Sequence, residues 1–436
     1  MSAGPRDAAV KIVQRLRDAG HIAYFAGGCV RDDLLGLSPT DYDVATEARP
    51  DVVAGLFRGS REVGKAFGVM LVRVSGVTVE VSTFRREGPY SDRRRPDEVT
   101  FCDARSDAFR RDFTVNALFI DPLAGAPGGP GEVIDFVDGK ADLSRRVIRA
   151  VGDPDQRLSE DHLRALRAAR IAARLGFEID TPTADAIRRH ARQLAGVSRE
   201  RIGDEIRRML CDPNRARAVR LVRELGLEGP VLDPERRAGE HIPSPLSATV
   251  IERLPVSSGF ALSLAAWEID RMDSAAGDGS RVAIDVIEAR QPPAASRLRA
   301  AICLSNEERD SFTSAWSSLV FLERDWENAA VARRKRGAAD PGFAMGLALL
   351  RSRQPQVADD RERELRALAQ TPGGVAPPPL VTGDDLIAAG LPASPAFGRW
   401  LEQAYDEQLE GRIGSKEEAV ARVREWASAA SKSRNP

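Results

Sequence analysis

The sequence predicts an α+β protein, with a mixed sheet and helices in the first 140 residues and a mainly α-helical remainder. Before residue 140, short β-branched and apolar runs such as Val69–Val74 and Val77–Phe84 are typical of strands. Beyond residue 140 the composition shifts to Ala, Leu and Arg, and apolar residues recur at helical spacing. With 436 residues, 42% of them hydrophobic, the chain is large enough for two to four domains with sizeable cores.

The first elements in the chain are predicted from spacing and from helix-ending residues. Apolar residues recur every three or four positions across residues 7–19, which predicts a helix that ends at Gly20. Residues 25–46 predict a strand, then a turn or helix, then a second strand. Pro50 then opens a predicted short helix, because proline is common in the first helical turn.

The two β-branched runs form a predicted hairpin with Gly76 at its turn. Residues 85–109 are polar and contain Gly and Pro, which predicts a mobile loop. Residues 132–139 predict the last strand of this region and the chain's exit from it. A domain boundary is therefore expected near residue 140.

The segment 25–46 holds the residues with the clearest chemistry. Asp41 and Asp43 are separated by one residue, so on a strand both carboxylates point to the same face. Mg²⁺ is usually held by one or two carboxylates together with substrate phosphates, and two such ions can hold the attacking and leaving oxygens of an in-line displacement. The alternative is that this Asp-x-Asp is only the solvated end of a strand.

The glycine pair before these acids could serve a phosphate. Gly27 and Gly28 lack a Cβ, so a triphosphate can approach their N–H groups closely, and Arg31 could add a charged fork. A Gly-Gly pair alone usually marks only a turn. Glu80, on the second strand of the hairpin, could be a third acid or simply a strand charge that faces solvent.

In combination, Gly-Gly-x-Val-Arg-Asp followed by Asp-x-Asp resembles the catalytic signature of the tRNA nucleotidyltransferase and poly(A) polymerase family, in its bacterial and eukaryotic class II. The resemblance implies a nucleotidyltransferase head like that of DNA polymerase β, with Mg²⁺ at Asp41 and Asp43 and a carboxylate near Glu80. It also implies that the loop at 85–109 serves the switch to adenosine incorporation.

Residues 110–117 resemble the second signature of this family. There the resemblance implies that Arg111 holds the triphosphate, that Asp112 accepts a hydrogen bond from the ribose 2′-hydroxyl, and that Asn116 orders the site. An Arg-Arg-Asp triplet alone usually lies on a solvated face. Its position at this interval after the Asp-x-Asp is what favours the functional interpretation.

Residues 159–176 predict one helix, with Ser159 as N-cap and Gly176 as C-cap. It carries Asp161 and arginines at intervals of three or four, so that neighbouring members share a face: Arg164, Arg167, Arg170 and Arg174. An acceptor beside a donor fork could read the edge of cytosine or adenine. The alternative is a salt-bridged surface helix, but Glu-Asp-x-x-Arg resembles the family's base-reading motif.

The remaining chain predicts a helical neck over 141–226, a helical body over 227–370, a linker over 371–379 and a helical tail over 380–436. The tail resembles that of bacterial members of the family, which implies contact with RNA, and the alternative is an interaction module without RNA contact. The neck includes a second basic helix over 198–210. Basic residues exceed acidic ones by 20 to 13 between 140 and 225, whereas the whole chain has a net charge of −1. This local excess suits an RNA backbone.

The resemblance therefore implies an enzyme that adds CCA to tRNA 3′ ends from CTP and ATP, without a template, with release of pyrophosphate and with Mg²⁺. The alternatives are a poly(A) polymerase, an enzyme that adds only CC or A, and a non-catalytic RNA-binding protein. The expected partners are the tRNA 3′ end, CTP and ATP, with no membrane and no DNA; no feature specifies an oligomeric state. Four scattered cysteines argue against a zinc site, and together with the absence of a long apolar run they favour the cytoplasm.

Overall fold

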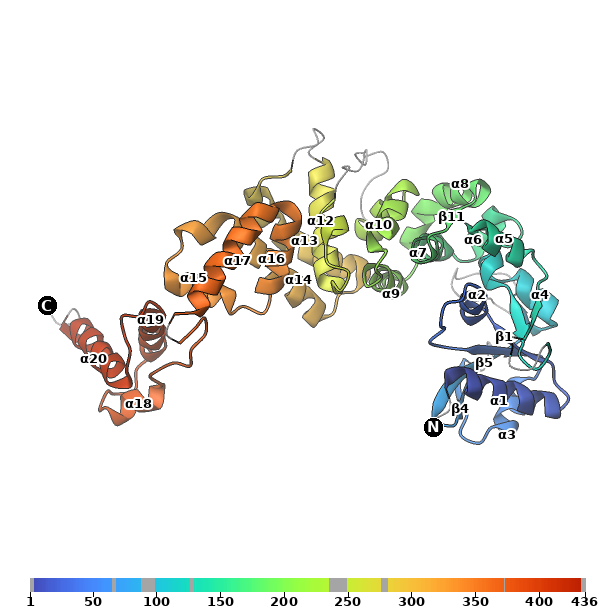
Figure 1. Cartoon of the computed structure of the whole chain (residues 1–436), viewed down its shortest axis with the longest axis horizontal. Helices are drawn as coiled ribbons and strands as arrows, with labels where there is room; N and C mark the ends of the chain where they lie inside the picture. Colours follow the sequence, from blue (N-terminus) through green and yellow to red (C-terminus); the bar gives the residue numbers. More distant parts are fainter. Residues whose placement is uncertain are drawn as a thin grey trace. The chain divides into compact units, whose positions relative to one another are not determined.

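A computed structural model of the chain describes residues 4–64, 68–87, 99–125, 129, 131–234, 249–275, 281–371 and 373–432. The chain forms two compact units, Met1–Ala238 and Gly239–Pro436, and Figure 1 shows its course through both. None of the helices in these described ranges is both long enough and apolar enough to cross a membrane.

The first unit is built on a seven-stranded mixed sheet, which confirms the predicted α+β class. Its strand order is β3-β4-β5-β2-β1-β8-β9, and β2 and β5 are the parallel pair among antiparallel neighbours. In chain order the strands are β1 (Ala23–Ala26), β2 (Asp43–Thr46), β3 (Arg61–Gly64), β4 (Val69–Val74), β5 (Val77–Thr83), β8 (Phe119–Asp121) and β9 (Glu132–Ile134).

Helix α1 (Pro5–Asp18) packs along one face of this sheet, against β1, β2, β4 and β5. Its periodic apolar residues are buried, and the chain turns at Gly20 with a φ of 86°. The predicted first helix is therefore confirmed. The helix after Pro50 is also confirmed, as α3 (Pro50–Leu56), as is the β4–β5 hairpin with Gly76 at a φ of 86°.

The predicted last strand and its exit are confirmed, with β9 ending at Ile134. Two predictions for this region need correction. Asp41 precedes β2, which begins at Asp43, so only one of the two acids is on the strand. Within 85–109, the described residues include β6 (Arg85–Glu87), which pairs with β7 (Val99–Phe101), and α4 (Ala104–Phe109). The centre of the predicted loop, 88–98, lies outside the described residues.

The rest of the first unit is helical apart from a small parallel pair, β10 (Val147–Ile148) and β11 (Glu178–Ile179). The predicted helix over 159–176 is wrong in its first part, because the chain breaks between two helices at 161–163. Ser159 lies inside the first of them, and only the C-terminal end at Gly176 is as predicted. The helices are α2 (Gly28–Leu34), α5 (Gly139–Arg145), α6 (Pro154–Glu160), α7 (Arg164–Leu175), α8 (Thr181–His190), α9 (Arg199–Leu210), α10 (Arg215–Glu224) and α11 (Glu228–Leu232).

The described part of the second unit is helical, as the mainly α-helical prediction requires. Buried tryptophans on three of its elements, Trp267, Trp316 and Trp326, contribute to its core. Its α-helices are α12 (Phe260–Ala275), α13 (Ile284–Ile302), α14 (Asn306–Val320), α15 (Val331–Ala338), α16 (Phe343–Arg353), α17 (Pro355–Ala369), α18 (Gly383–Ala388), α19 (Phe397–Leu409) and α20 (Lys416–Lys432).

One tight contact in the first unit gives a stability prediction. A Cβ on Gly139 would overlap the carbonyl oxygen of Thr114 and lie 2.9 Å from Leu118 Cδ2. Thr114 begins the 3₁₀ turn Thr114–Asn116, so Gly139→Ala should displace that turn and lower the free energy of unfolding by about 2 kcal/mol. Urea unfolding measures it. Gly55→Ala, in α3 with open space around the glycine, is the control and should not destabilise. Equal effects would contradict the packing argument.

Candidate active site

The predicted glycine turn connects β1 to α2 with an unusual backbone conformation. Gly27 has a φ of 80° and a ψ of −132°, which side chains rarely tolerate. A Cβ there would also lie 3.2 Å from Arg111 Nη1, and one on Gly28 would lie 3.6 Å from Arg31 Nη2. The turn therefore needs glycine at Gly27 and keeps bare backbone next to two arginine side chains.

The predicted acids lie at the start of β2 and on its parallel neighbour β5. Tyr42 is buried and donates its hydroxyl to Asp33 Oδ1 at 2.9 Å, while Asp41 and Asp43 on either side of it are exposed. Val44 on β2 pairs with Val81 on the parallel strand β5. The residues that precede them, Asp43 and Glu80, are therefore neighbours across the two strands. The structure thus brings Glu80 beside Asp43, with both side chains exposed on the same face.

The electrostatics of these acids suit a cation. Desolvation and the negative charges of Glu80 and Asp41 raise the pKa of Asp43 to about 6, although the positive charge of Arg111 opposes the rise. A carboxylate held among like charges is stabilised by a positive ion. No group of three or more His, Cys, Asp or Glu side chains within the described ranges is arranged to hold a metal. Mg²⁺ needs only one or two carboxylates when phosphates complete its shell, so Asp41 and Asp43 fit it.

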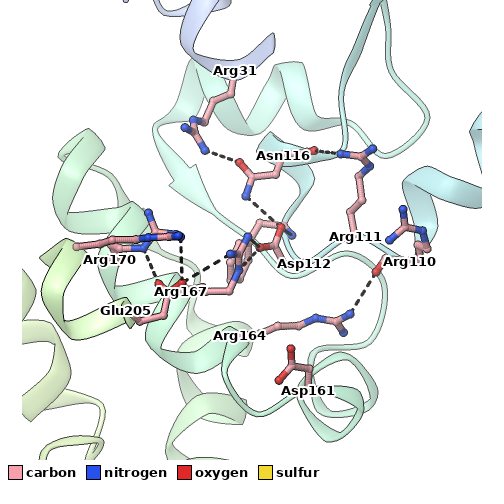
Figure 2. Close-up of polar contacts among 12 residues, drawn as sticks. Arg31, Arg110, Arg111, Asp112, Asn116, Asp161, Arg164, Arg167, Arg170 and Glu205 are labelled. Atoms are coloured by element: carbon pink, nitrogen blue, oxygen red, sulfur yellow. Dashed lines mark hydrogen bonds and ion pairs between the residues drawn. The ribbon is translucent and has the colours of Figure 1, made fainter. Parts of the chain in front are cut away.

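Arg31 does not extend into solvent; its side chain is buried. Its Nε donates to Asp32 Oδ1 at 2.8 Å and its Nη1 to Asn116 Oδ1 at 2.5 Å, and Arg31 is 4% exposed. Burial lowers the pKa of its guanidinium, which the charge of Asp32 opposes. In this structure Arg31 orders Asn116, and Figure 2 shows that contact.

Asn116 in turn holds the carboxylate of Asp112. Asn116 Nδ2 donates to Asp112 Oδ1 at 3.0 Å, and the same oxygen accepts the Phe113 N–H at 2.8 Å. Asp112 Oδ2 accepts from Arg167 Nε at 2.9 Å and from Nη2 at 2.7 Å. Although burial opposes it, the charge of Arg167 holds the pKa of Asp112 well below its usual range. Four donors occupy this carboxylate, which is its usual capacity.

Arg111 belongs to the second signature, and its guanidinium lies next to the glycine turn. Its Nη1 donates to the Asn116 carbonyl oxygen at 3.3 Å, and its Nε and Nη2 donate to Asp107 Oδ2 at 3.1 and 3.0 Å. Asp107 also accepts from Arg110, and although burial opposes it, both arginine charges lower its pKa. The sequence analysis missed Asp107, although its i,i+3 and i,i+4 spacing to the arginines was a local signal.

Arg164, the predicted base reader, is 7% exposed in this structure. Its Nη1 donates at 2.6 Å both to the Arg157 carbonyl oxygen and to Glu160 Oε2, and its Nη2 reaches the Arg110 carbonyl oxygen at 3.3 Å. Figure 2 shows this last contact. Arg164 therefore ties the start of α7 to the second signature.

Asp161 differs from its predicted placement. It caps the end of α6 in extended conformation, so it does not share a helix face with Arg164. Its Oδ2 accepts from Arg201 Nη2 on α9 at 2.6 Å, and its Oδ1 accepts the Leu163 N–H at 3.1 Å. The acid and the arginine are therefore held by separate partners. The missed local signal was Asp153-Pro154, a cap followed by a first-turn proline that starts α6.

Two further arginines of α7 meet on Glu205 of α9. Arg170 Nε donates to Glu205 Oε2 at 2.6 Å, and Arg167 Nη1 lies 3.8 Å from Oε1. Figure 2 shows both contacts, which extend the chain of polar contacts from Arg31 to α9. Glu205 was missed because the sequence alone does not place α9 against α7. The structure brings the predicted nucleotide-binding residues of both signatures into one network with this helix.

Two protein-family models match separate parts of the first unit. Residues 23–149 match the model of the poly A polymerase head domain, and residues 176–238 match the probable RNA and SrmB-binding site of polymerase A. The chain is 42% identical over 215 residues to a CCA-adding enzyme of Bacillus pumilus, covering 49% of this chain and 52% of that protein. It is 41% identical over 224 residues to one of Geobacillus stearothermophilus, covering 51% and 54%. The match spans about half the length of these curated relatives.

Solved structures extend the similarity to the whole fold. The CCA-adding enzyme of Bacillus stearothermophilus in complex with CTP superposes with a TM-score of 0.74 at 27% identity, over 99% of this chain and 100% of that one. A Thermotoga maritima CCA-adding enzyme complexed with tRNA has a TM-score of 0.63 at 18% identity, over 98% and 97%, which supports the fold alone.

Proposed function

Because residues 23–149 match the poly A polymerase head domain and half of the chain is similar to CCA-adding enzymes, we propose that it adds CCA to tRNA 3′ ends from CTP and ATP. The observation that carries the proposal is the place of Arg111. Its guanidinium lies next to the Gly27 turn, and its positive charge opposes the rise in the pKa of Asp43 that desolvation and Glu80 cause. A triphosphate at the turn would therefore lie near the acids.

In the proposed reaction the RNA 3′-oxygen attacks the α-phosphorus of the nucleotide. The new O–P bond forms as the bond to the β-phosphate oxygen breaks, and pyrophosphate leaves. Bound Mg²⁺, held by Asp41 and Asp43 beside Glu80, would lower the pKa of the hydroxyl and neutralise phosphate charge. The Gly27 and Gly28 backbone and Arg111 bind the triphosphate, which aligns the α-phosphorus with the attacking oxygen.

Ribose recognition by Asp112 requires a rearrangement. Since its acceptor positions are filled, a 2′-hydroxyl must displace one donor. We assign this exchange to Arg167, whose side chain is 33% exposed and which also has Glu205 as a partner. Arg31 and Asn116 then keep Asp112 in place while Arg167 turns toward the base.

For base choice we propose that Arg164 and Asp161 present a donor fork and an acceptor to cytosine or adenine, with Arg167 and Arg170 behind them. Partly buried partners hold both groups in advance: Glu160 holds Arg164, and Arg201 holds Asp161. A site built to satisfy defined donors and acceptors rejects bases that leave them unpaired. Uracil and guanine present their hydrogen-bond donors and acceptors in a different arrangement and would be rejected.

Arg164→Ala should reduce incorporation of both CTP and ATP by at least about tenfold and should lower the preference over UTP, because the fork is lost. Initial rates with each single nucleotide measure this. Arg189→Ala is the control, because Arg189 forms an exposed ion pair with Asp155 on the same unit. Retained preference in Arg164→Ala would show that the base is read elsewhere.

The direct test of the proposal is release of pyrophosphate from CTP or ATP, with Mg²⁺ and a tRNA that lacks CCA. We expect release with both nucleotides, dependent on the tRNA. Long A tails favour a poly(A) polymerase, and use of a single nucleotide favours a CC- or A-adding enzyme. No release would favour the non-catalytic RNA-binding protein. Contact of residues 380–436 with RNA remains a prediction.

A further inference from the structure

A buried carboxylate joins the glycine-turn helix to the far end of the arginine helix. Asp32, on α2, is 5% exposed; its Oδ1 accepts from Arg31 Nε at 2.8 Å and its Oδ2 from Arg174 Nη2 at 2.9 Å. Arg174 belongs to the last turn of α7. The Asp32–Arg174 contact therefore spans from the element after the glycine turn to the end of α7.

Helix α7 is attached to the sheet-bearing half of the unit at three points along its length. At its start Arg164 donates to the Arg110 carbonyl oxygen, and at its middle Arg167 donates to Asp112. Arg174 is the third, and it lies ten residues after Arg164, which is about 15 Å along a helix axis. A base held at Arg164 is thus out of reach of Arg174, so this contact can influence the base only through the helix.

We propose that Asp32 and Arg174 are positioning residues that set the orientation of α7 relative to the glycine turn, so that nucleotide selection and phosphate alignment are coupled. This rests on the proposed function. With the end of α7 fixed on α2, a base at Arg164 and a triphosphate at Gly27 and Gly28 are held in one geometry. Without it, the end of α7 loses its polar contact with α2 and is held by its packing against α9 and α10.

The contact is suited to positioning more than to stability. The Arg174 side chain is 43% exposed, and exposed ion pairs contribute little to the free energy of unfolding. Asp32 keeps Arg31 as a partner when Arg174 is removed. A displacement of about 1 Å at reacting atoms, however, can cost about a hundredfold in rate. Loss of Arg174 should therefore slow the reaction more than it weakens the fold.

The test is Arg174→Gln, assayed with a tRNA lacking CCA and with CTP, ATP or UTP. We expect kcat to fall at least about fivefold, KM for CTP and ATP to stay within about twofold, and the relative use of UTP to rise about fivefold. Arg174→Lys, which keeps a donor, should recover at least half of the lost kcat. A merely structural contact would lower the active fraction equally for all nucleotides and leave their ratio unchanged.

The matched control is Arg217→Gln, which removes an arginine bonded to Glu178 and to the Phe177 carbonyl oxygen elsewhere on the same unit. It should leave kcat and the UTP ratio unchanged. If the wild-type protein is active but Arg174→Gln leaves the relative use of UTP unchanged, this inference alone is overturned. The same holds if Arg217→Gln changes kcat and the relative use of UTP as much as Arg174→Gln does. A wild-type protein that adds no nucleotide overturns the proposed function and this inference with it.

Discussion

Replacing both Asp41 and Asp43 by alanine should reduce nucleotide incorporation by at least about a thousandfold, because these are the two acids that would hold Mg²⁺ in the proposed chemistry. Single-nucleotide incorporation with Mg²⁺ and tRNA measures the loss. Asp18→Ala, at the exposed end of α1, is the control and should retain full activity. Unchanged incorporation in the double variant would contradict the catalytic assignment.

Of these two acids, Asp43 is expected to lower the stability of the fold. The folded-state pKa of Asp43, about 6, lies above its ordinary value of 3.8, so its ionised form opposes folding. Its unfavourable effect grows as the pH rises from about 4 to about 6 and is complete at pH 7. Asp43→Asn should therefore raise the free energy of unfolding at pH 7 by about 1 kcal/mol while activity falls. A less stable variant would show that Asp43 supports the fold.

Replacing Arg167 by alanine should be among the most destabilising single changes in the first unit. It would leave Asp112 buried with its charge and without its bidentate partner, which we expect to cost about 3 kcal/mol in the free energy of unfolding. Urea unfolding measures it. Arg188→Ala, whose ion pair with Asp185 is exposed on both sides, should cost under about 0.5 kcal/mol.

The double variant Asp112→Asn with Arg167→Ala distinguishes charge burial from lost packing. Asparagine removes the unpaired charge, so the double variant should recover about half of the lost stability. Incorporation of CTP and ATP should stay low in both variants, because Arg167 and the ribose acceptor are lost. Full additivity of the two single changes would contradict the coupling of Asp112 and Arg167.

Local sequence signals predicted the elements whose ends are set by one or two residues. Gly20, Gly76 and Gly176 each adopt a positive φ, as their positions after a helix or within a hairpin required. The break before Arg164 was missed because helical periodicity continues across it. Asp161 is extended there, and its carboxylate is held by the Leu163 N–H and by Arg201, which comes from another helix.

Site residues were predictable by type and position but not by partner. Glu80 stands beside Asp43 because β2 and β5 are parallel neighbours, a pairing that the sequence does not specify. Arg31 was expected to point at phosphates, yet Asp32 and Asn116 hold it inside. Glu205 had no local signal, since its partners Arg167 and Arg170 lie on α7 and become neighbours only after folding.

The measurement that tests the central claim most directly is the length and sequence of products from three tRNA transcripts. They end before CCA, after C and after CC, and each is incubated with purified protein, Mg²⁺ and CTP, ATP or both. The account predicts that all three are completed to CCA with both nucleotides and that extension stops there. Products with long A tails, products confined to one nucleotide, or no extension would contradict it.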